Sequence, residues 1–206
     1  MIEPIIQNLF PTPIYTTKIN RKFTKKESTF FYNQKKFVTK NEGNVSSIDN
    51  YILNRKELKN IKNIIDAACE DYLQKIICPE NNIKLYVTQS WLNYTESNEY
   101  HHKHEHPNSV ISGVLYLDSN KEKDKIFFSK PGYNQISPKI NDKKYNIWNS
   151  SSWFFPVETG NLFMFPSSTT HQVETKKGNN TRVSLAFNTF YKGDLGENES
   201  LTELIL

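Results

Sequence analysis

The most regular hydrophobic pattern in the chain lies in residues 54–77. Apolar side chains recur there at spacings of three and four residues, which places them on one face of an α-helix. The apolar positions are Leu58, Ile61, Ile65, Ala68, Cys69, Tyr72 and Ile76. Asn54 and Glu57 have the spacing of a capping box, and Pro79 stands just beyond the end. We expect this helix to lie along a sheet and support it.

After residue 83 the pattern changes to short segments rich in β-branched and aromatic residues, separated by turn-forming residues. The segments that predict strands are 83–94, 110–117, 125–128, 153–155, 160–165 and 182–191. A further edge strand is expected within residues 9–19, where Pro11 and Pro13 disfavour a central position. Residues 129–152, rich in Ser, Asn, Lys and Pro, predict a long loop.

Many short strands after one helix indicate a mainly β fold of the sandwich or jelly-roll type. The length of 206 residues suits a single domain. We expect an N-terminal strand and helical support over 1–82, a β core over 83–193 and a tail over 194–206.

Composition narrows the class of protein. Apolar residues make up 36% of the chain, and no run approaches the roughly 18 residues that a membrane-spanning helix needs. An aromatic content of 13% argues against disorder. The N-terminus has no basic region before its short apolar stretch, and Cys69 and Cys78 form no CxxC motif. These features predict a cytoplasmic protein with reduced thiols and no contact with a membrane.

The basic residues are very unevenly divided between lysine and arginine. Of 26 basic residues only three are arginines, Arg21, Arg55 and Arg182, so 23 are lysines. The basic stretch 21–40 allows a polyanion-binding face, but lysine is common throughout the chain, which favours a solvated surface. The net charge of +4 therefore says little about partners.

Histidine shows the opposite distribution, because it is rare and clustered. Four of the five histidines lie within six positions, and the fifth is His171. The four are His101, His102, His104 and His106. In an extended strand alternate side chains share a face, which would bring His102, His104 and His106 together. Neutral imidazoles in this arrangement bind Fe, Zn, Cu or Ni, so the segment predicts a metal site.

Arg182 stands eleven residues after His171 and two before Ser184. A planar guanidinium can hold a carboxylate through two parallel hydrogen bonds, which lysine cannot do. In a chain that otherwise uses lysine, this arginine suggests a carboxylate clamp in the same pocket as the histidines. The alternative is an ordinary ion pair.

Together these residues resemble the 2-oxoglutarate- and Fe(II)-dependent oxygenases of the double-stranded β-helix superfamily, and more narrowly a family of such oxygenases common in phage and marine bacterial genomes. The matching segments are residues 9–15, 91–93, 104–109, 112–117, 160–167, His171 and 182–188. The resemblance implies a double-stranded β-helix (jelly-roll, cupin-like) fold. It also implies an Fe(II) cofactor, 2-oxoglutarate as co-substrate, and O2. The activity implied is a dioxygenase of hydroxylase type, and the compartment would be the host cytoplasm if the protein is phage-encoded.

By position, the resemblance assigns His104 and His171 as metal ligands, with His106 where most of the superfamily has Asp or Glu. It assigns Arg182, assisted by Ser184, to the distal carboxylate of 2-oxoglutarate. Two further residues match co-substrate positions, Tyr116 beside that carboxylate and Asn93 at the other end.

The chain departs from the superfamily in having no H-x-D or H-x-E motif. His102 could replace His106 as the third ligand, and Glu99 or Glu105 could supply a carboxylate if the loop bends. The order of the motifs favours His104 and His106.

The sequence is also compatible with two other classes of protein. A cupin-like metal-binding module would usually have Glu at position 110 or 111 and Asn at 175, where this chain has Val110, Ile111 and Thr175. A phage structural jelly roll would leave Arg182 without a role. A nucleic-acid partner is disfavoured because no second arginine follows Arg182. The primary substrate is unidentified, and helix 54–77 or the N-terminal strand could form a homodimer face.

Overall fold

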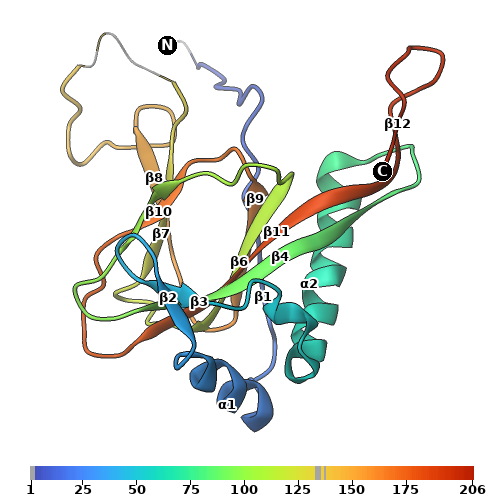
Figure 1. The fold of residues 1–206 in the computed structure, drawn as a ribbon. Helices are drawn as coiled ribbons and strands as arrows, with labels where there is room; N and C mark the ends of the chain where they lie inside the picture. Colours follow the sequence, from blue (N-terminus) through green and yellow to red (C-terminus); the bar gives the residue numbers. More distant parts are fainter. Residues whose placement is uncertain (1–2, 133–135, 137) are drawn as a thin grey trace.

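The computed structural model describes residues 3–132, 136 and 138–206, and its main feature is a pair of antiparallel β-sheets (Figure 1). The eight-stranded sheet has the order β1-β9-β6-β11-β4-β3-β2, with β12 also pairing with β11. The four-stranded sheet has the order β5-β10-β7-β8. This arrangement confirms the expectation of a mainly β, jelly-roll type fold with helical support from the N-terminal part of the chain.

The elements have the following bounds. The strands of the larger sheet are β1 (Tyr15–Lys18), β2 (Val38–Lys40), β3 (Val45–Ser47), β4 (Ile83–Thr95), β6 (Ile111–Asp118), β9 (Asn161–Pro166), β11 (Arg182–Leu195) and β12 (Leu204–Ile205). Those of the smaller sheet are β5 (His101–His104), β7 (Lys125–Ser129), β8 (Ser152–Pro156) and β10 (His171–Val173). The helices are α1 (Lys25–Gln34) and α2 (Lys59–Tyr72), with short helical turns η1 (Ile52–Asn54), η2 (Lys56–Leu58) and η3 (Leu73–Ile77).

The central strands β6 and β9 of the larger sheet are buried on both faces, and strand alternation gives the two faces different roles. On β6, Leu115 and Leu117 belong to the core shared with the helices, whereas Tyr116 belongs to the core between the sheets. The same division holds on β9, where Leu162 packs with the helix-side core and Phe163 packs between the sheets. Side chains on the inner face of this sheet therefore point at the smaller sheet.

Helix α2 packs against β4, on the outer side of the long β4–β11 pair (Figure 1). Its apolar stripe is the one that the spacing predicts, and Ile61, Ile65, Ala68, Cys69 and Tyr72 are all buried. The predicted start of this helix is wrong. Two short turns, η1 and η2, precede α2, and its N-cap is Leu58, which makes no side-chain hydrogen bond. The box expected at Asn54 and Glu57 does not form because those residues lie in the η1 and η2 turns.

A capping box does form at α1, within the stretch that composition alone assigned to a solvated surface. The Thr24 side chain accepts a hydrogen bond from the backbone of Glu27, whose carboxylate accepts one from the Thr24 N–H. Arg21 completes the corner through two hydrogen bonds to the buried Glu27 carboxylate. Arg21, the first residue of the basic stretch, therefore stabilises the start of α1 instead of pointing into solvent as a free charge.

The predicted strands correspond closely to β1, β4, β6, β7, β8, β9 and β11, with β1 at the edge of its sheet as expected. The short β2–β3 hairpin lacks a recognisable sequence pattern. Within the loop predicted at 129–152, residues 133–135 and 137 lie outside the described residues. Among the helices of the described part of the chain, none combines the length and the apolar character that a membrane crossing requires.

Candidate active site

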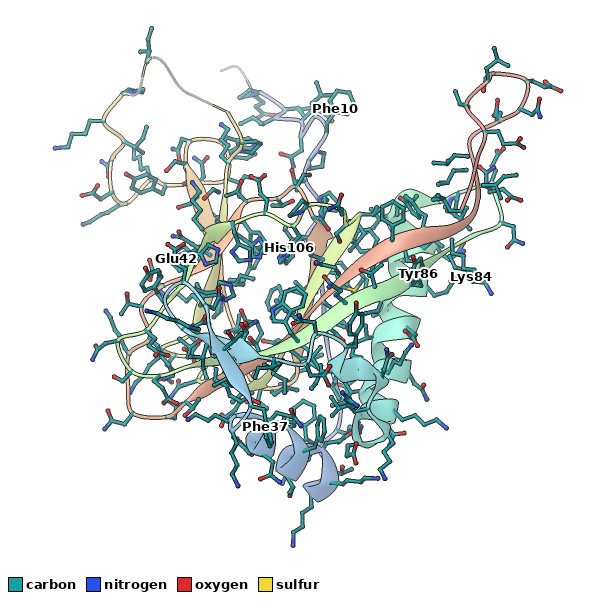
Figure 2. The ribbon with its side chains drawn as sticks, viewed as in Figure 1. Phe10, Phe37, Glu42, Lys84, Tyr86 and His106 are labelled. Atoms are coloured by element: carbon teal, nitrogen blue, oxygen red, sulfur yellow. The ribbon has the colours of Figure 1, made fainter. Side chains whose placement is uncertain are left out.

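All five histidines of the chain come together in one cluster, and four of them, His101, His104, His106 and His171, line a cavity between the two sheets. The ring centroids of His104 lie 4.3 Å from those of His171, 4.8 Å from His106 and 4.7 Å from both His101 and His102. His104 is therefore the centre of the cluster. Figure 2 shows His106 between the sheets and Glu42 nearby, on the turn of the β2–β3 hairpin.

The expectation that His102, His104 and His106 share one face of a strand is wrong, because β5 ends at His104 and His102 groups with His101 and not with His106. His104 pairs with His171 and His101 pairs with Val173, so three steps along β5 match two along β10. This register shift is a β-bulge, which changes the side of the strand on which a residue lies. As a result the His101 ring stacks on that of His104 with an interplanar angle of 14°.

His104, His106 and His171 form a compact set of potential metal ligands. One ring nitrogen from each lies within 4.8 Å of the others. Nδ1 of His104 lies 2.8 Å from the carbonyl of His102, and Nδ1 of His171 lies 3.0 Å from the carbonyl of Thr169. A carbonyl can only accept, so each Nδ1 carries the proton and each Nε2 keeps a free lone pair for a metal.

His106 is held by a network of serines, of which Ser112 and Ser167 are buried and Ser109 is half-buried. Its backbone N–H donates to the Ser167 carbonyl at 3.0 Å. The Ser167 hydroxyl bonds those of Ser109 at 2.7 Å and Ser112 at 2.8 Å. Ser112 in turn donates to the side-chain oxygen of Asn188 on β11. The loop after β5 is thereby fastened to β6, to β11 and to the turn that follows β9, which fixes the approach of His106 to the other two rings.

A small cavity of about 40 Å³ separates the histidines from the inner face of the larger sheet. Asn93, Ser184 and Tyr116 line it from adjacent strands, because Ser184 pairs with Asn93 on β4 and with Tyr116 on β6. Trp91 closes another side and packs against His106, with ring centroids 5.8 Å apart. The three polar residues assigned by resemblance to the co-substrate thus lie in one row that faces the histidines.

Arg182 lies next to this row, at the start of β11, and is almost completely buried. Its Nη1 donates to the Asp124 carboxylate at 3.1 Å, while Nη2 has no hydrogen-bond partner. The hydroxyl of Tyr116 and the Oδ1 of Asn93 are also buried without a partner. Buried polar groups are nearly always paired, so these three atoms mark a position for a polar ligand. Two of them belong to an Arg and a Tyr, which can donate hydrogen bonds to a carboxylate.

The carboxylates considered as alternative metal ligands are engaged elsewhere. Glu105 is exposed and accepts a hydrogen bond from the Thr170 hydroxyl. Glu99 accepts one from the backbone N–H of Glu96 at 2.7 Å. His102 lies beside His104 but groups with His101 rather than with His106 and His171. Within the described residues, the triad of His104, His106 and His171 has no carboxylate among its potential ligands.

The pKa values of His104, His106 and His171 are lowered, so their imidazoles are neutral at pH 7. Burial, reinforced by the neighbouring His104 ring, lowers the pKa of His106 to about 4 and that of His171 to about 3. Burial also lowers the pKa of His104. Burial raises the pKa of Tyr116, so its hydroxyl stays protonated and available as a donor. At neutral pH the site therefore offers free ring nitrogens on one side and hydrogen-bond donors on the other.

These shifts predict an acid-dependent loss of stability in the metal-free protein. The unfolded chain binds a proton at His106 near pH 6.5, whereas the folded protein binds it only near pH 4. Between these values the unfolded state holds more protons, so the free energy of unfolding falls as the pH drops. From pH 7 to 4.5, His106 contributes a loss of about 2–3 kcal/mol. Denaturant unfolding at pH 7 and pH 4.5 measures this effect. The free energy of unfolding of His106→Asn should fall between these two pH values by less than that of the wild type, the difference being this amount. An equal fall in the two proteins would contradict a lowered pKa of His106 in the folded state.

Two residues of the site could not be predicted from the sequence, His101 and Asp124. His101 enters through the bulge, for which the sequence carries no recognisable mark. Asp124 lies 58 positions before Arg182. Its neighbours in the sequence have mixed charges, which is typical of an exposed turn, yet Asp124 is fully buried. The backbone N–H of Asn120, four residues earlier, donates a hydrogen bond to the Asp124 carboxylate at 2.8 Å, which helps to hold the carboxylate in place.

Solved structures with a similar fold include a member of the 2OG-Fe(II) oxygenase family and a protein solved with 2-oxoglutarate. HygX from Streptomyces hygroscopicus, solved with nickel, 2-oxoglutarate and hygromycin B, superposes with a TM-score of 0.59 at 8% identity, covering 86% of this chain and 82% of HygX. A prolyl-4-hydroxylase from Pseudomonas putida gives 0.53 at 12% identity, with 86% and 92% covered. An oxidoreductase of the 2OG-Fe(II) oxygenase family from Burkholderia pseudomallei gives 0.53 at 13%, with 79% and 76% covered.

No curated protein shows a significant sequence match to the chain. A family model does match the region that contains the histidines and the row of polar residues. Residues 89–188 match the family described as "Putative 2OG-Fe(II) oxygenase".

Proposed function

We propose that this protein is a 2-oxoglutarate- and Fe(II)-dependent oxygenase of hydroxylase type. The observation that carries the proposal is a pair of buried donors without partners, Nη2 of Arg182 and the hydroxyl of Tyr116. Tyr116 lines the cavity opposite the three neutral histidines, and Arg182 lies beside it, two residues before the cavity-lining Ser184 on β11. A dicarboxylic co-substrate would satisfy both sides. One carboxylate would meet Arg182 and Tyr116, and the oxo-acid end would reach a metal on the imidazoles.

The residues fit iron as well as the co-substrate. His104, His106 and His171 would hold the metal through Nε2 atoms, at least two of which are oriented by Nδ1–carbonyl hydrogen bonds. Imidazole is a suitable ligand for Fe(II). When bound, the iron supplies the chemistry that couples decarboxylation of 2-oxoglutarate to succinate with oxidation of a substrate by O2.

Charge balance supports three histidines in place of the usual two histidines and one carboxylate. In the usual arrangement the ligand carboxylate and the two charges of 2-oxoglutarate offset Fe(II) and the clamp arginine. Here the ligand set is neutral, but the buried Asp124 carboxylate pairs with Arg182. The negative charge is thus located beside the clamp instead of at the metal, and the loaded cavity has the same net charge.

The protein's own contribution is positioning and exclusion of water. Asp124 directs the guanidinium of Arg182 so that one amino group stays free for the co-substrate. The serine network fixes His106, and Trp91 covers one side of it. A pre-formed polar site of this kind avoids reorganisation when charged ligands bind.

Binding of 2-oxoglutarate with and without metal tests the proposal. Calorimetric titration into metal-free and Ni(II)-loaded protein should give tight binding only with Ni(II), because the metal holds the oxo-acid end. Pyruvate, which has no distal carboxylate for Arg182, is the matched control and should bind more weakly. Metal binding without 2-oxoglutarate binding would favour a cupin-like metal module. Binding of neither would favour a structural jelly roll.

The finer assignments rest on the sequence resemblance. We place the chain in the double-stranded β-helix superfamily and in its phage and marine bacterial branch, and we expect it to act in the cytoplasm. HygX was solved with hygromycin B, and a Trichoplax adhaerens prolyl hydroxylase with a peptide fragment. The molecules bound in these two structures are thus of different chemical classes.

A further inference from the structure

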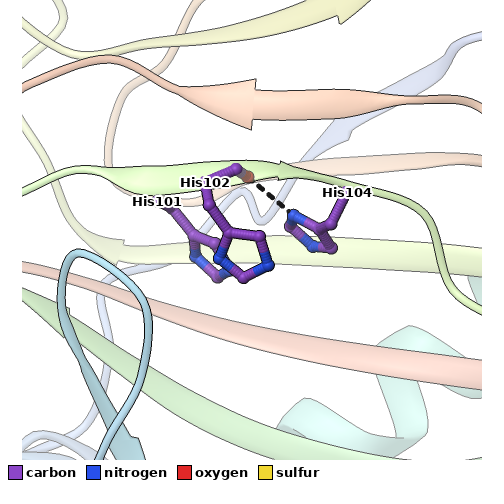
Figure 3. A group of neighbouring side chains, drawn as sticks. All are labelled: His101, His102 and His104. Carbon is purple, nitrogen blue, oxygen red and sulfur yellow. Dashed lines mark hydrogen bonds between the residues drawn. The ribbon is translucent and has the colours of Figure 1, made fainter.

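A second group of histidines lies on the outer side of His104. One ring nitrogen from each of His101, His102 and His104 lies within 4.8 Å of the others, the same limit that holds for the inner triad. The ring centroids are 4.7 to 5.3 Å apart. Figure 3 shows the three rings on one side of β5, with Nδ1 of His104 bonded to the carbonyl of His102. The lone pair of His104 is therefore left on Nε2 for either group.

This outer group opens toward the surface. His101 and His102 line a groove with Glu42, Tyr100, Lys103 and Glu174, whereas His101 also lines the inner cavity. The turn of the β2–β3 hairpin closes one side, since the Tyr100 N–H donates to the Gly43 carbonyl at 3.0 Å. The two carboxylates of the groove are matched by Lys103 and Lys177, so its charge does not repel a cation.

We propose that His101, His102 and His104 form a second, outer position for a divalent transition-metal ion, which binds the incoming ion before it reaches the inner triad. His104 belongs to both positions and has a single free nitrogen, so only one of them is occupied at a time. An ion at the outer position reaches the inner one by keeping His104 and exchanging His101 and His102 for His106 and His171. This inference concerns metal entry and does not depend on which reaction the inner site catalyses.

Equilibrium binding of Co(II), followed by its visible absorption, tests the existence of the outer position. His171→Ala removes an inner ligand only, so it should still bind one Co(II), about 10- to 100-fold more weakly than the wild type. Adding His102→Ala to it should abolish this residual binding. His104→Ala alone should abolish binding at both positions. Residual binding that survives in the double variant, or in His104→Ala, would overturn the proposal, as would complete loss of binding in His171→Ala.

The rate of Co(II) uptake by metal-free protein tests the role in entry. His102→Ala leaves the inner cavity lining intact, because His102 is not part of it. This variant should take up Co(II) about tenfold more slowly, with the final affinity and Ni(II)-dependent binding of 2-oxoglutarate unchanged. Lys103→Ala, an exposed neighbour that cannot ligate a metal as an ammonium, is the control and should load at the wild-type rate. An uptake rate equal to that of the wild type in His102→Ala would rule out a role in entry.

Discussion

Arg182→Lys is expected to weaken 2-oxoglutarate binding by about 10- to 100-fold while leaving metal affinity unchanged, in line with the 1.5–3 kcal/mol of a charge-assisted hydrogen bond. The guanidinium holds Asp124 through Nη1 and leaves Nη2 free in a fixed direction. A lysine ammonium keeps the charge but lacks the planar fork, so it cannot serve both partners with the same geometry.

Calorimetry with Ni(II)-loaded Arg182→Lys measures this directly, and titration of Ni(II) into the metal-free variant provides the control. The three histidines come from β5, the loop after it and β10, whereas Arg182 starts β11 in the other sheet. Metal affinity should therefore not respond. A parallel loss of metal and 2-oxoglutarate binding would mean that Arg182 maintains the fold of the cavity and is not a co-substrate clamp.

Asp124→Asn is expected to lower the free energy of unfolding of the unliganded protein by about 3 kcal/mol, since it leaves a buried cation without its counter-charge. Asp124 is fully buried and Arg182 is only 3% exposed, so solvent cannot compensate. The asparagine keeps the size and one acceptor oxygen, so the guanidinium should stay in place. Thermal or urea unfolding measures the loss.

The same variant should be stabilised by Ni(II) and 2-oxoglutarate more than the wild type is, because the co-substrate carboxylate then supplies the missing negative charge. A purely structural ion pair would not produce this difference. The control is Asp66→Asn, which removes the exposed pair with Lys62 and should cost less than about 1 kcal/mol. An equal gain on ligand binding in wild type and Asp124→Asn would place Asp124 outside the co-substrate site.

Most of the fold could be predicted because its strands have strong local patterns. Alternation alone explains why Asn93, Tyr116 and Ser184 share a face, since each lies between core residues on its own strand. The helix α2 could be predicted because its apolar residues recur at spacings of three and four. Its start could not be predicted, because the choice between a capped α-helix and two short helical turns depends on contacts with the sheet, where Leu53 donates its N–H to the Ser90 hydroxyl.

The parts of the site that resisted prediction depend on long-range geometry. The bulge in β5 lies in its pairing with β10, about 70 residues later in the chain, and His101 is the β5 residue on the far side of this register shift. The residues around Asp124 have the composition of an exposed turn. Asp124 belongs to the site only because it lies immediately before β7, beside Arg182. Neither feature changes the local hydrophobic pattern.

The most direct test of the account is spectroscopic. Under anaerobic conditions, Fe(II) and then 2-oxoglutarate are added to metal-free protein, and the weak visible charge-transfer band of an Fe(II)–2-oxoglutarate chelate is recorded. We expect the band in the wild type and its absence in His171→Ala. A wild-type protein that shows no band at saturating Fe(II) and 2-oxoglutarate would contradict it.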